Sequence, residues 1–364
     1  MTRWQDRRIL ELFGIELPII QAPMAGATTV AMVAAASNAG GLGSLPSAQY
    51  GVEQLRAALR QVRDATSKPI NVNFFCHATP DDNEAAQTRW RTMLAPYFIE
   101  LGLDPSAPVS GAGRAPFDNM FCEVVEEFRP NVVSFHFGLP EPSLVGRVKA
   151  TGAKIVSSAT TVEEAVWLET HEVDAVIAMG VEAGGHRGNF LTNDMSTQVG
   201  TMALVPQVVD AVRVPVIAAG GISDGRGVAA ALMLGASAVQ VGTAYLYCPE
   251  AKIPAVHAAA LNRATDDNTA ITNVFTGRPA RGVLNRIMRE LGPLSKSVPP
   301  FPTAGAALAA LRAKAEASGR DDFTNLWSGQ AARLVERLPA AELTQRLFDY
   351  AMVVIVTRSA SPEV

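Results

Sequence analysis

The chain has 364 residues, of which 48% are hydrophobic, and it carries a formal net charge of −4 at pH 7. This composition supports a large core, and (β/α)8 barrels with insertions reach such a length as one unit. The weak acidity, without long runs of like charge, excludes nucleic acid and anionic membranes as main partners. A small-molecule ligand is therefore expected.

The cysteines and the N-terminal segment indicate a cellular compartment. Cys76, Cys122 and Cys248 stand at wide spacing that suits neither a disulfide framework nor a CxxC metal site. The N-terminus alternates charged and apolar residues and lacks the apolar core of a signal peptide. No run approaches the roughly 18 apolar residues of a membrane span. The sequence therefore predicts a cytoplasmic protein without membrane contact.

Eight short apolar runs alternate with helix-compatible segments, a pattern typical of parallel βαβ units. The fold class predicted is α/β, a TIM (β/α)8 barrel with an additional lid or substrate-binding subdomain. An open doubly wound sheet is the alternative, but no GxGxxG follows the first strand. The expected strands are 19–22, 41–45, 70–75, 132–137, 154–158, 175–179, 214–219 and 238–241, and the expected helices include 30–38, 52–63, 162–171, 205–212 and 225–234.

Two regions interrupt this regular repeat. The chain between the third and fourth strands is too long for a loop and one helix. A second long region follows the eighth strand. We therefore expect a barrel over 1–250 with an insertion at about 78–130, and a C-terminal helical extension over 251–364 that folds over the barrel mouth as a lid.

A glycine-rich turn with one histidine follows the sixth expected strand. It reads Val-Glu-Ala-Gly-Gly-His-Arg-Gly over Val181–Gly188 and should place His186 at the carboxyl rim of the barrel, where α/β enzymes hold their catalytic groups. Gly184 and Gly185 keep side chains away from the imidazole, as a bound ligand would require. The alternative is a structural histidine beside a tight turn.

Glycines also end the last two expected strands, at Gly220-Gly221 and at Gly242. In barrels this is where backbone N–H groups bind phosphate. The first strand ends in small residues around Pro23 and Met24, which could lie against a flat ring. The third carries Asn71 and Asn73, one of whose amides should point to the mouth and could bond ring heteroatoms.

Other polar residues have both functional and structural interpretations. His136, at the end of the fourth strand, is a second candidate catalytic histidine, although it could instead hydrogen-bond a loop carbonyl. Cys76-His77 has no second ligand pair, so no metal is expected. His171 and His257 lie in helical segments and should be on the surface. Arg278 and Arg281 could bind an anionic substrate group, or could be solvated or cap carbonyls.

Taken in this order, the segments resemble the nitronate monooxygenase family, formerly called 2-nitropropane dioxygenases, and most closely its bacterial class I members. The resemblance implies noncovalent FMN and oxidation of alkyl nitronates, such as propionate 3-nitronate, by O2 through a flavin semiquinone to a carbonyl compound and nitrite. It implies His186 as the catalytic histidine. The matching segments are Gln21–Met24, Asn71–His77, Ser134–Gly138, Val181–Gly188, Ala218–Ile222, Gln240–Thr243, Thr276–Gly282 and Leu326–Gln330.

The resemblance also implies a cofactor site with one departure from the family pattern. Met179 stands where the family commonly has a glutamine, and a thioether cannot replace an amide that donates a hydrogen bond to flavin. The candidate FMN-binding residues are Pro23, Met24, Asn73, Met179, Gly184, Gly185, Gly220, Gly221, Gln240, Val241, Gly242 and Thr243.

Two further functions remain open at this point. The same barrel with a similar turn serves flavin-dependent enoyl-acyl-carrier-protein reductases and NADH:quinone reductases, although no dinucleotide fingerprint is visible here. Arg187 and the Asn73–His77 segment favour the oxidase. A non-catalytic flavin-binding protein is the other alternative. The oligomeric state, monomer or homodimer, is not fixed by the sequence.

Overall fold

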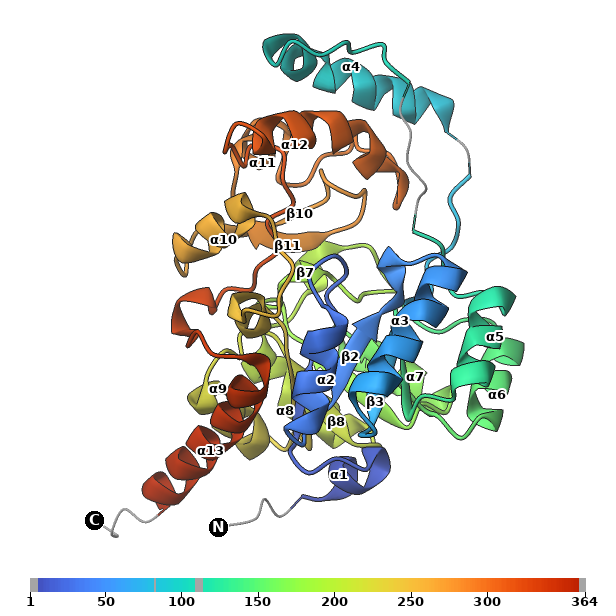
Figure 1. The fold of residues 1–364 in the computed structure, drawn as a ribbon, viewed down its shortest axis with the longest axis vertical. Coiled ribbons are helices and arrows are strands. Elements are labelled where there is room, and N and C mark those ends of the chain that lie inside the picture. The colour runs from blue at the N-terminus through green and yellow to red at the C-terminus, as the bar shows by residue number, and fades with distance from the viewer. Residues whose placement is uncertain (1–5, 82, 109–113, 360–364) are drawn as a thin grey trace.

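The computed structural model describes residues 6–81, 83–108 and 114–359 and shows a barrel with a second layer of helices and strands above one end (Figure 1). The first five residues, on which part of the signal-peptide prediction rests, lie outside the described residues. Eight parallel strands pair in the order β1-β9-β8-β6-β5-β4-β3-β2, and a bridge between Ile20 and Leu42 joins the two ends. The predicted TIM barrel is confirmed. Its strands are β1 (Ile19–Gln21), β2 (Gly43–Pro46), β3 (Ile70–Phe75), β4 (Val132–His136), β5 (Lys154–Ala159), β6 (Ala175–Met179), β8 (Val216–Ala219) and β9 (Ala238–Val241).

The helices around the barrel follow from apolar spacing and capping. In α3, Leu55, Leu59 and Val62 recur on one face and are buried. Thr29 caps α2 by accepting from the N–H of Met32 at 3.2 Å. The barrel helices are α2 (Val30–Asn38), α3 (Val52–Ala65), α5 (Asn119–Phe128), α6 (Pro142–Ala150), α7 (Val162–Thr170), α8 (Thr201–Ala211) and α9 (Gly225–Met233), with short 3-10 turns η1 (Ser47–Gln49), η2 (Met195–Thr197) and η3 (Thr243–Tyr247) between elements.

The interior of the barrel changes from apolar to polar along its axis. At the amino ends of the strands, Ile177 and Ile217 pack against Phe13 of α1 (Arg8–Phe13), which closes that end. In the middle of the barrel, the amide nitrogen of Asn71 donates to the hydroxyl of Ser134 at 2.9 Å. Alternating side chains of each strand face the interior, so polar groups extend from this layer to the carboxyl mouth.

The last helix, α13 (Ala340–Ser359), belongs to the barrel wall. It packs between α9 and α2, and its Thr344 hydroxyl shares a 2.7 Å hydrogen bond with the Tyr245 hydroxyl. A Cβ on Gly225 would come within 2.5 Å of Tyr350, so this contact requires glycine at the start of α9. The lid expected over 251–364 therefore does not include α13, because its apolar face is buried against the barrel helices.

The remaining elements form a layer above the mouth, which we call the cap. A three-stranded antiparallel sheet in the order β10-β11-β7 lies next to the barrel, and α4 lies farthest from both termini (Figure 1). The cap consists of β7 (Gly185–His186), β10 (Thr269–Thr272), β11 (Ala280–Val283), α4 (Glu84–Glu100), α10 (Ala255–Asn262), α11 (Arg286–Leu291), η4 (Thr303–Leu308), α12 (Ala309–Glu316) and η5 (Ala332–Leu334).

The insertion after β3 joins the C-terminal extension through α4. The Trp90 indole donates to the carbonyl of Ala304 at 3.2 Å, and both carboxylate oxygens of Glu100 accept from Arg286 at 2.7 Å. Helix α5, in contrast, packs on α3 and α6 as a regular barrel helix. The insertion expected at about 78–130 is therefore limited to the part before α5. Over the described residues, no helix is both long enough and apolar enough to span a membrane.

Candidate active site

His186 lies in β7, directly above the barrel mouth. Its strand pairs with β11, so that His186 stands opposite Ala280, and its Nε2 shares a 3.0 Å hydrogen bond with the hydroxyl of Thr276. The ring is only 8% exposed. Aromatic rings surround it, with centroids 5.4 Å away for Phe301 and 5.5 Å away for Trp327. The histidine ring is therefore buried and has one polar partner among the described residues.

The turn before His186 depends on its glycines. A Cβ on Gly184 would come within 2.5 Å of the backbone nitrogen of Gly329, so only glycine allows the chain around Ser328 to lie this close. Gly185 adopts φ +74°, in the left-handed region that favours glycine, and a Cβ there would meet no atom within 4 Å. Glu182, earlier in the turn, accepts from the Thr201 N–H at 2.9 and 3.0 Å. Helix α8 consequently begins at Thr201, earlier than the helix expected at 205–212.

The surroundings of His186 favour its neutral form. Burial is the largest cause that holds the pKa of His186 well below 6.5, and the positive charge of Arg114 is the second. His136, Arg278 and His77 act in the same direction. His186 is therefore a neutral imidazole at neutral pH, surrounded by cationic side chains.

His136 contacts the backbone that carries the candidate catalytic histidine. Its Nε2 lies 3.2 Å from the carbonyl oxygen of His186, which can only accept, so Nε2 carries the proton. Its Nδ1 then accepts from the Ser158 hydroxyl at 3.1 Å. Burial lowers the pKa of His136 to about 3. Both ring nitrogens are engaged, so His136 positions the turn of His186 through the backbone.

Two histidines that the sequence did not assign to the site lie close to it. His77 packs against Phe301, with ring centroids 4.7 Å apart, and burial lowers its pKa to about 4. His257 was expected on the surface, which is wrong. It is 6% exposed, and its Nε2 donates to the carbonyl of Trp327 at 3.0 Å, which fixes the aromatic residue beside His186. His171 is on the surface, as expected.

The candidate cofactor residues from the last strands meet at the mouth. The amide of Gln240 forms no hydrogen bond with the described residues. Gly220 and Gly221 have φ values of +115° and +67°, and the backbone N–H groups of Gly221 and Gly242 have no acceptor within the described part of the chain. Met179 ends β6 and is 8% exposed. Unpaired N–H groups beside a free amide at the mouth fit the phosphate and ring of a flavin.

The other candidate cofactor residues border this position. The N–H of Ala22 donates to the carbonyl of Val241 at 2.9 Å, which brings the segment with Pro23 and Met24 beside Gly242. A Cβ on Gly242 would lie 3.9 Å from the sulfur of Met24. Two more candidates bond other parts of the protein: the Asn73 amide nitrogen donates to the Ser134 carbonyl at 3.2 Å, and the Thr243 hydroxyl oxygen accepts from the Gly329 N–H at 2.9 Å.

The first turn of α9 offers no free site for an anion. The Asp224 carboxylate accepts from the N–H groups of Arg226 and Gly227 at 2.9 and 3.2 Å and pairs with the Arg226 guanidinium. A carboxylate at this position repels phosphate. The glycine turns that end β8 and β9 are therefore the better location for a cofactor phosphate.

Two arginines of the site motifs are structural braces. Arg187, with no exposed surface, donates to the carbonyls of Met179 and Gly180 at 2.8 and 2.7 Å. Arg281 donates to the carbonyl of Val181 at 2.9 Å and to the Thr269 hydroxyl at 3.0 Å. Both therefore fix the backbone between β6 and His186. Arg281 matches the carbonyl-capping interpretation given above.

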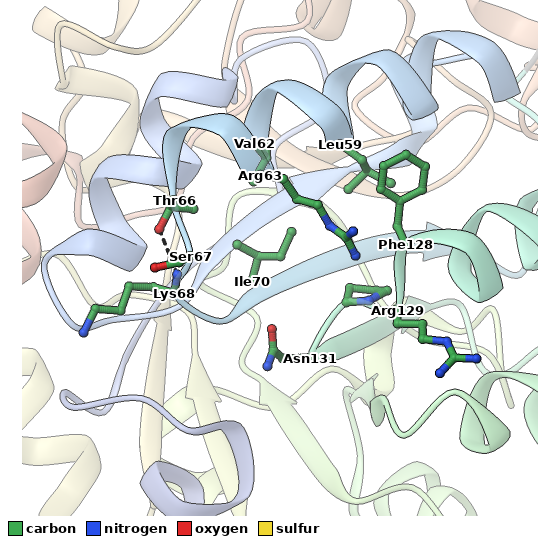
Figure 2. Close-up of a pocket in the computed structure, with 11 residues that line it drawn as sticks. Leu59, Val62, Arg63, Thr66, Ser67, Lys68, Ile70, Phe128, Arg129 and Asn131 are labelled. Carbon is green, nitrogen blue, oxygen red and sulfur yellow. Dashed lines mark hydrogen bonds between the residues drawn. The ribbon is translucent and has the colours of Figure 1, made fainter.

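A cavity of about 300 Å³ lies at the opposite end of the barrel, between α3 and α5 (Figure 2). Its lining includes Arg63, whose guanidinium carbon lies 5.2 Å from the centroid of the Phe128 ring, and the turns before β3 and β4. These turns form the amino face of the barrel, where contacts serve stability and not catalysis. The cavity is thus separate from the His186 site.

The fold and site together define a (β/α)8-barrel enzyme with its histidine and glycine turns at the carboxyl mouth. The model of the nitronate monooxygenase family matches residues 6–349. The chain is 43% identical to the nitronate monooxygenase of Pseudomonas aeruginosa, covering 94% of this chain and 98% of that one. It is 42% identical to that of Paraburkholderia phytofirmans, with 94% of each covered. The chain belongs to the nitronate monooxygenase family of flavin-dependent oxidoreductases.

Solved structures extend this comparison. A nitroalkane oxidase from Streptomyces ansochromogenes superposes with a TM-score of 0.86 at 34% identity, covering 96% of this chain and 99% of that one. FabK from Thermotoga maritima superposes with a TM-score of 0.74 at 28% identity, covering 99% of both chains. The same barrel therefore carries more than one named activity, and only the site can separate them.

Proposed function

We propose that the protein oxidises alkyl nitronates with O2, using FMN, to a carbonyl compound and nitrite. One observation carries this proposal: a neutral, buried His186 lies among cationic side chains at the mouth of a flavin barrel. Such a site favours a substrate that arrives as an anion, because the arginines offset its charge. A nitronate is an anion with an electron-rich carbon.

The residues at the mouth suit FMN. The N–H groups of Gly221 and Gly242 would bind its phosphate, and the amide of Gln240 would bond the ring. Pro23 and Met24 would lie along the flat face. Bound FMN supplies the electron acceptor for the nitronate carbon and passes electrons to O2. Asn73, Met179, Gly184, Gly185, Gly220, Val241 and Thr243 complete the proposed cofactor site.

The protein residues bind and orient the substrate. Phe75, Phe301 and Trp327 exclude water around His186, which strengthens polar contacts there. As a neutral imidazole of low pKa, His186 hydrogen-bonds the substrate but is a weak base. Removing a proton from a neutral nitroalkane needs a stronger base. The site therefore favours the preformed nitronate over its parent nitroalkane.

The purified protein should be yellow, and denaturation should release free FMN into solution. The expectation follows from the backbone groups at Gly221 and Gly242, which hold a phosphate without a covalent bond. Mixing the protein anaerobically with propane 2-nitronate should bleach the flavin, and NADH should not. Rapid bleaching by NADH would favour a reductase, and no bleaching by either would favour a binding protein. Colourless protein that takes up no added FMN would contradict the proposed site.

Met179→Gln should tighten FMN binding by about two- to tenfold, since one added hydrogen bond at a preformed site contributes roughly 0.5–1.5 kcal/mol. Alternation along β6 turns Met179 toward the interior, on the same side as Ile177. Fluorescence titration of both apoproteins with FMN measures the change. Weaker binding would mean that the new amide is buried without a partner, and unchanged affinity that residue 179 does not touch the cofactor.

A further inference from the structure

Arg278 is half-buried and differs from the buried Arg187 and Arg281 because most of its guanidinium donors have no partner among the described residues. One Nη donates to the carbonyl of Asn189, but its Nε is buried and has no acceptor among the described residues. No carboxylate in the described part of the chain lies within ion-pair distance of Arg278. Arg187 and Arg281, in contrast, direct several donors to backbone carbonyls. A half-buried guanidinium without a counterion loses part of its hydration, and an anionic ligand would offset that loss.

The guanidinium of Arg278 and the ring of His186 both lie near the ring of Phe137. The guanidinium carbon of Arg278 lies 3.9 Å from the centroid of the Phe137 ring, and the His186 ring lies 6.1 Å from the same centroid. Thr276 links the His186 side chain to the backbone of Arg278. Its hydroxyl bonds His186 Nε2 at 3.0 Å and accepts from the N–H of Arg278 at 3.4 Å.

The backbone of Phe137 supplies a second, independent observation. Phe137 has φ +74°, although an aromatic residue rarely adopts the left-handed region, where L-residues lose about 1–2 kcal/mol. This conformation directs its ring beneath Arg278 and against His186. Strained residues that persist in a folded protein cluster at ligand sites. The strained backbone of Phe137 thus positions the ring on which the Arg278 guanidinium packs.

We propose that Arg278 binds the two oxygen atoms of the nitronate and holds them against Phe137, on the side of the mouth where His186 lies. This assignment rests on the proposed function and adds a substrate-binding residue to it. The planar O–N–O group of a nitronate has the shape and charge of a carboxylate, which the guanidinium fork matches with two parallel hydrogen bonds. His186, without a charge of its own, cannot replace that contact.

The first test measures binding without turnover. Isobutyrate has the planar anionic group and the branched carbon of propane 2-nitronate, and isobutyramide is its neutral counterpart. Flavin absorbance of the holoenzyme would report the affinity for each. We expect Arg278→Met to weaken isobutyrate binding by about tenfold to a hundredfold, with isobutyramide changed by less than about twofold. The isobutyrate affinity of Arg278→Lys should lie between those of the wild type and Arg278→Met, because lysine keeps the positive charge but loses the paired donors of the guanidinium. Arg289→Met, which removes an exposed charge from α11, should bind isobutyrate as the wild type does.

Equal isobutyrate affinity in Arg278→Met and the wild type would overturn the assignment. So would a wild-type holoenzyme that binds no isobutyrate. These outcomes are distinguishable from failure of the proposed function, which is seen when nitronate does not bleach wild-type flavin. If the wild type oxidises nitronate and Arg278→Met binds isobutyrate unchanged, only the substrate-binding role of Arg278 is refuted.

The second test needs no variant. Arg278 keeps its charge across about pH 6 to 9, because burial lowers its pKa only to about 10. The titratable and charged groups around it are His77, His136, His186, Arg114 and Glu164. We therefore expect isobutyrate affinity to stay constant over that range. If a protonated histidine supplied the charge instead, affinity would fall as pH rose across that range, and that result would overturn the proposal.

Discussion

His186→Asn should keep its flavin and lose nitronate turnover by about 10² to 10⁴-fold, the range for a positioned polar catalytic group. Asparagine can bond the Thr276 hydroxyl, so the turn should hold, but it does not place a ring nitrogen where the imidazole does. The proposed phosphate and ring contacts of Gly221, Gln240 and Gly242 lie at the ends of β8 and β9, and the His186 side chain is not one of the proposed flavin contacts. Steady-state oxygen consumption with a nitronate, together with the flavin absorbance of the purified variant, measures both halves of this expectation.

His171→Asn is the matched control, because His171 is exposed and stacks on Trp167 at the far end of α7. Its turnover should equal that of the wild type. If His186→Asn also turns over normally, His186 is a structural histidine of the β7–β11 pair. If it loses flavin instead, the imidazole itself helps to hold the cofactor.

The barrel was predictable because each strand carries its own local signal. Ala175–Met179 and Ile70–Phe75 agree with the expected ranges, since buried parallel strands read as short apolar runs. Strand β7 was not predictable. Gly185–His186 is too short to show an alternating pattern, and its partner β11 lies far along the chain. The position of His186 at the mouth follows from sequence, but its pairing with the cap does not.

Side-chain roles were predictable only where local spacing specifies them. His257 could have been placed inside, because Val256, Ala260 and Leu261 are buried with it on one face of α10. No such signal separates Arg278 from Arg281. Both are arginines of one short motif, and only distant contacts decide that Arg281 braces the carbonyl of Val181 while Arg278 keeps a free donor.

Arg187→Met should lower the free energy of unfolding by about 2–4 kcal/mol. The variant loses two hydrogen bonds from a charged group, to the carbonyls of Met179 and Gly180, at roughly 1.5–3 kcal/mol each, although the Gly180 carbonyl still accepts from the N–H of Ala183 at 3.1 Å. Methionine offsets part of this loss by removing a buried charge. The guanidinium pays a desolvation cost, since burial lowers the pKa of Arg187 to about 10, but it remains charged at neutral pH.

Urea unfolding of the flavin-loaded protein, followed by tryptophan fluorescence, measures the change. Arg187→Lys keeps the charge and can bond one of the two carbonyls, but not both at once. Its free energy of unfolding should therefore fall by less than that of Arg187→Met. Arg213→Met, which removes an exposed charge after α8, should unfold at the wild-type urea concentration. An Arg187→Met variant that unfolds at the wild-type urea concentration, or above it, would contradict this prediction. It would mean that the desolvation cost of the guanidinium exceeds the stabilisation from its carbonyl contacts. In that case the turn carrying His186 is held by Glu182 and the β7–β11 pair, and turnover should survive the substitution.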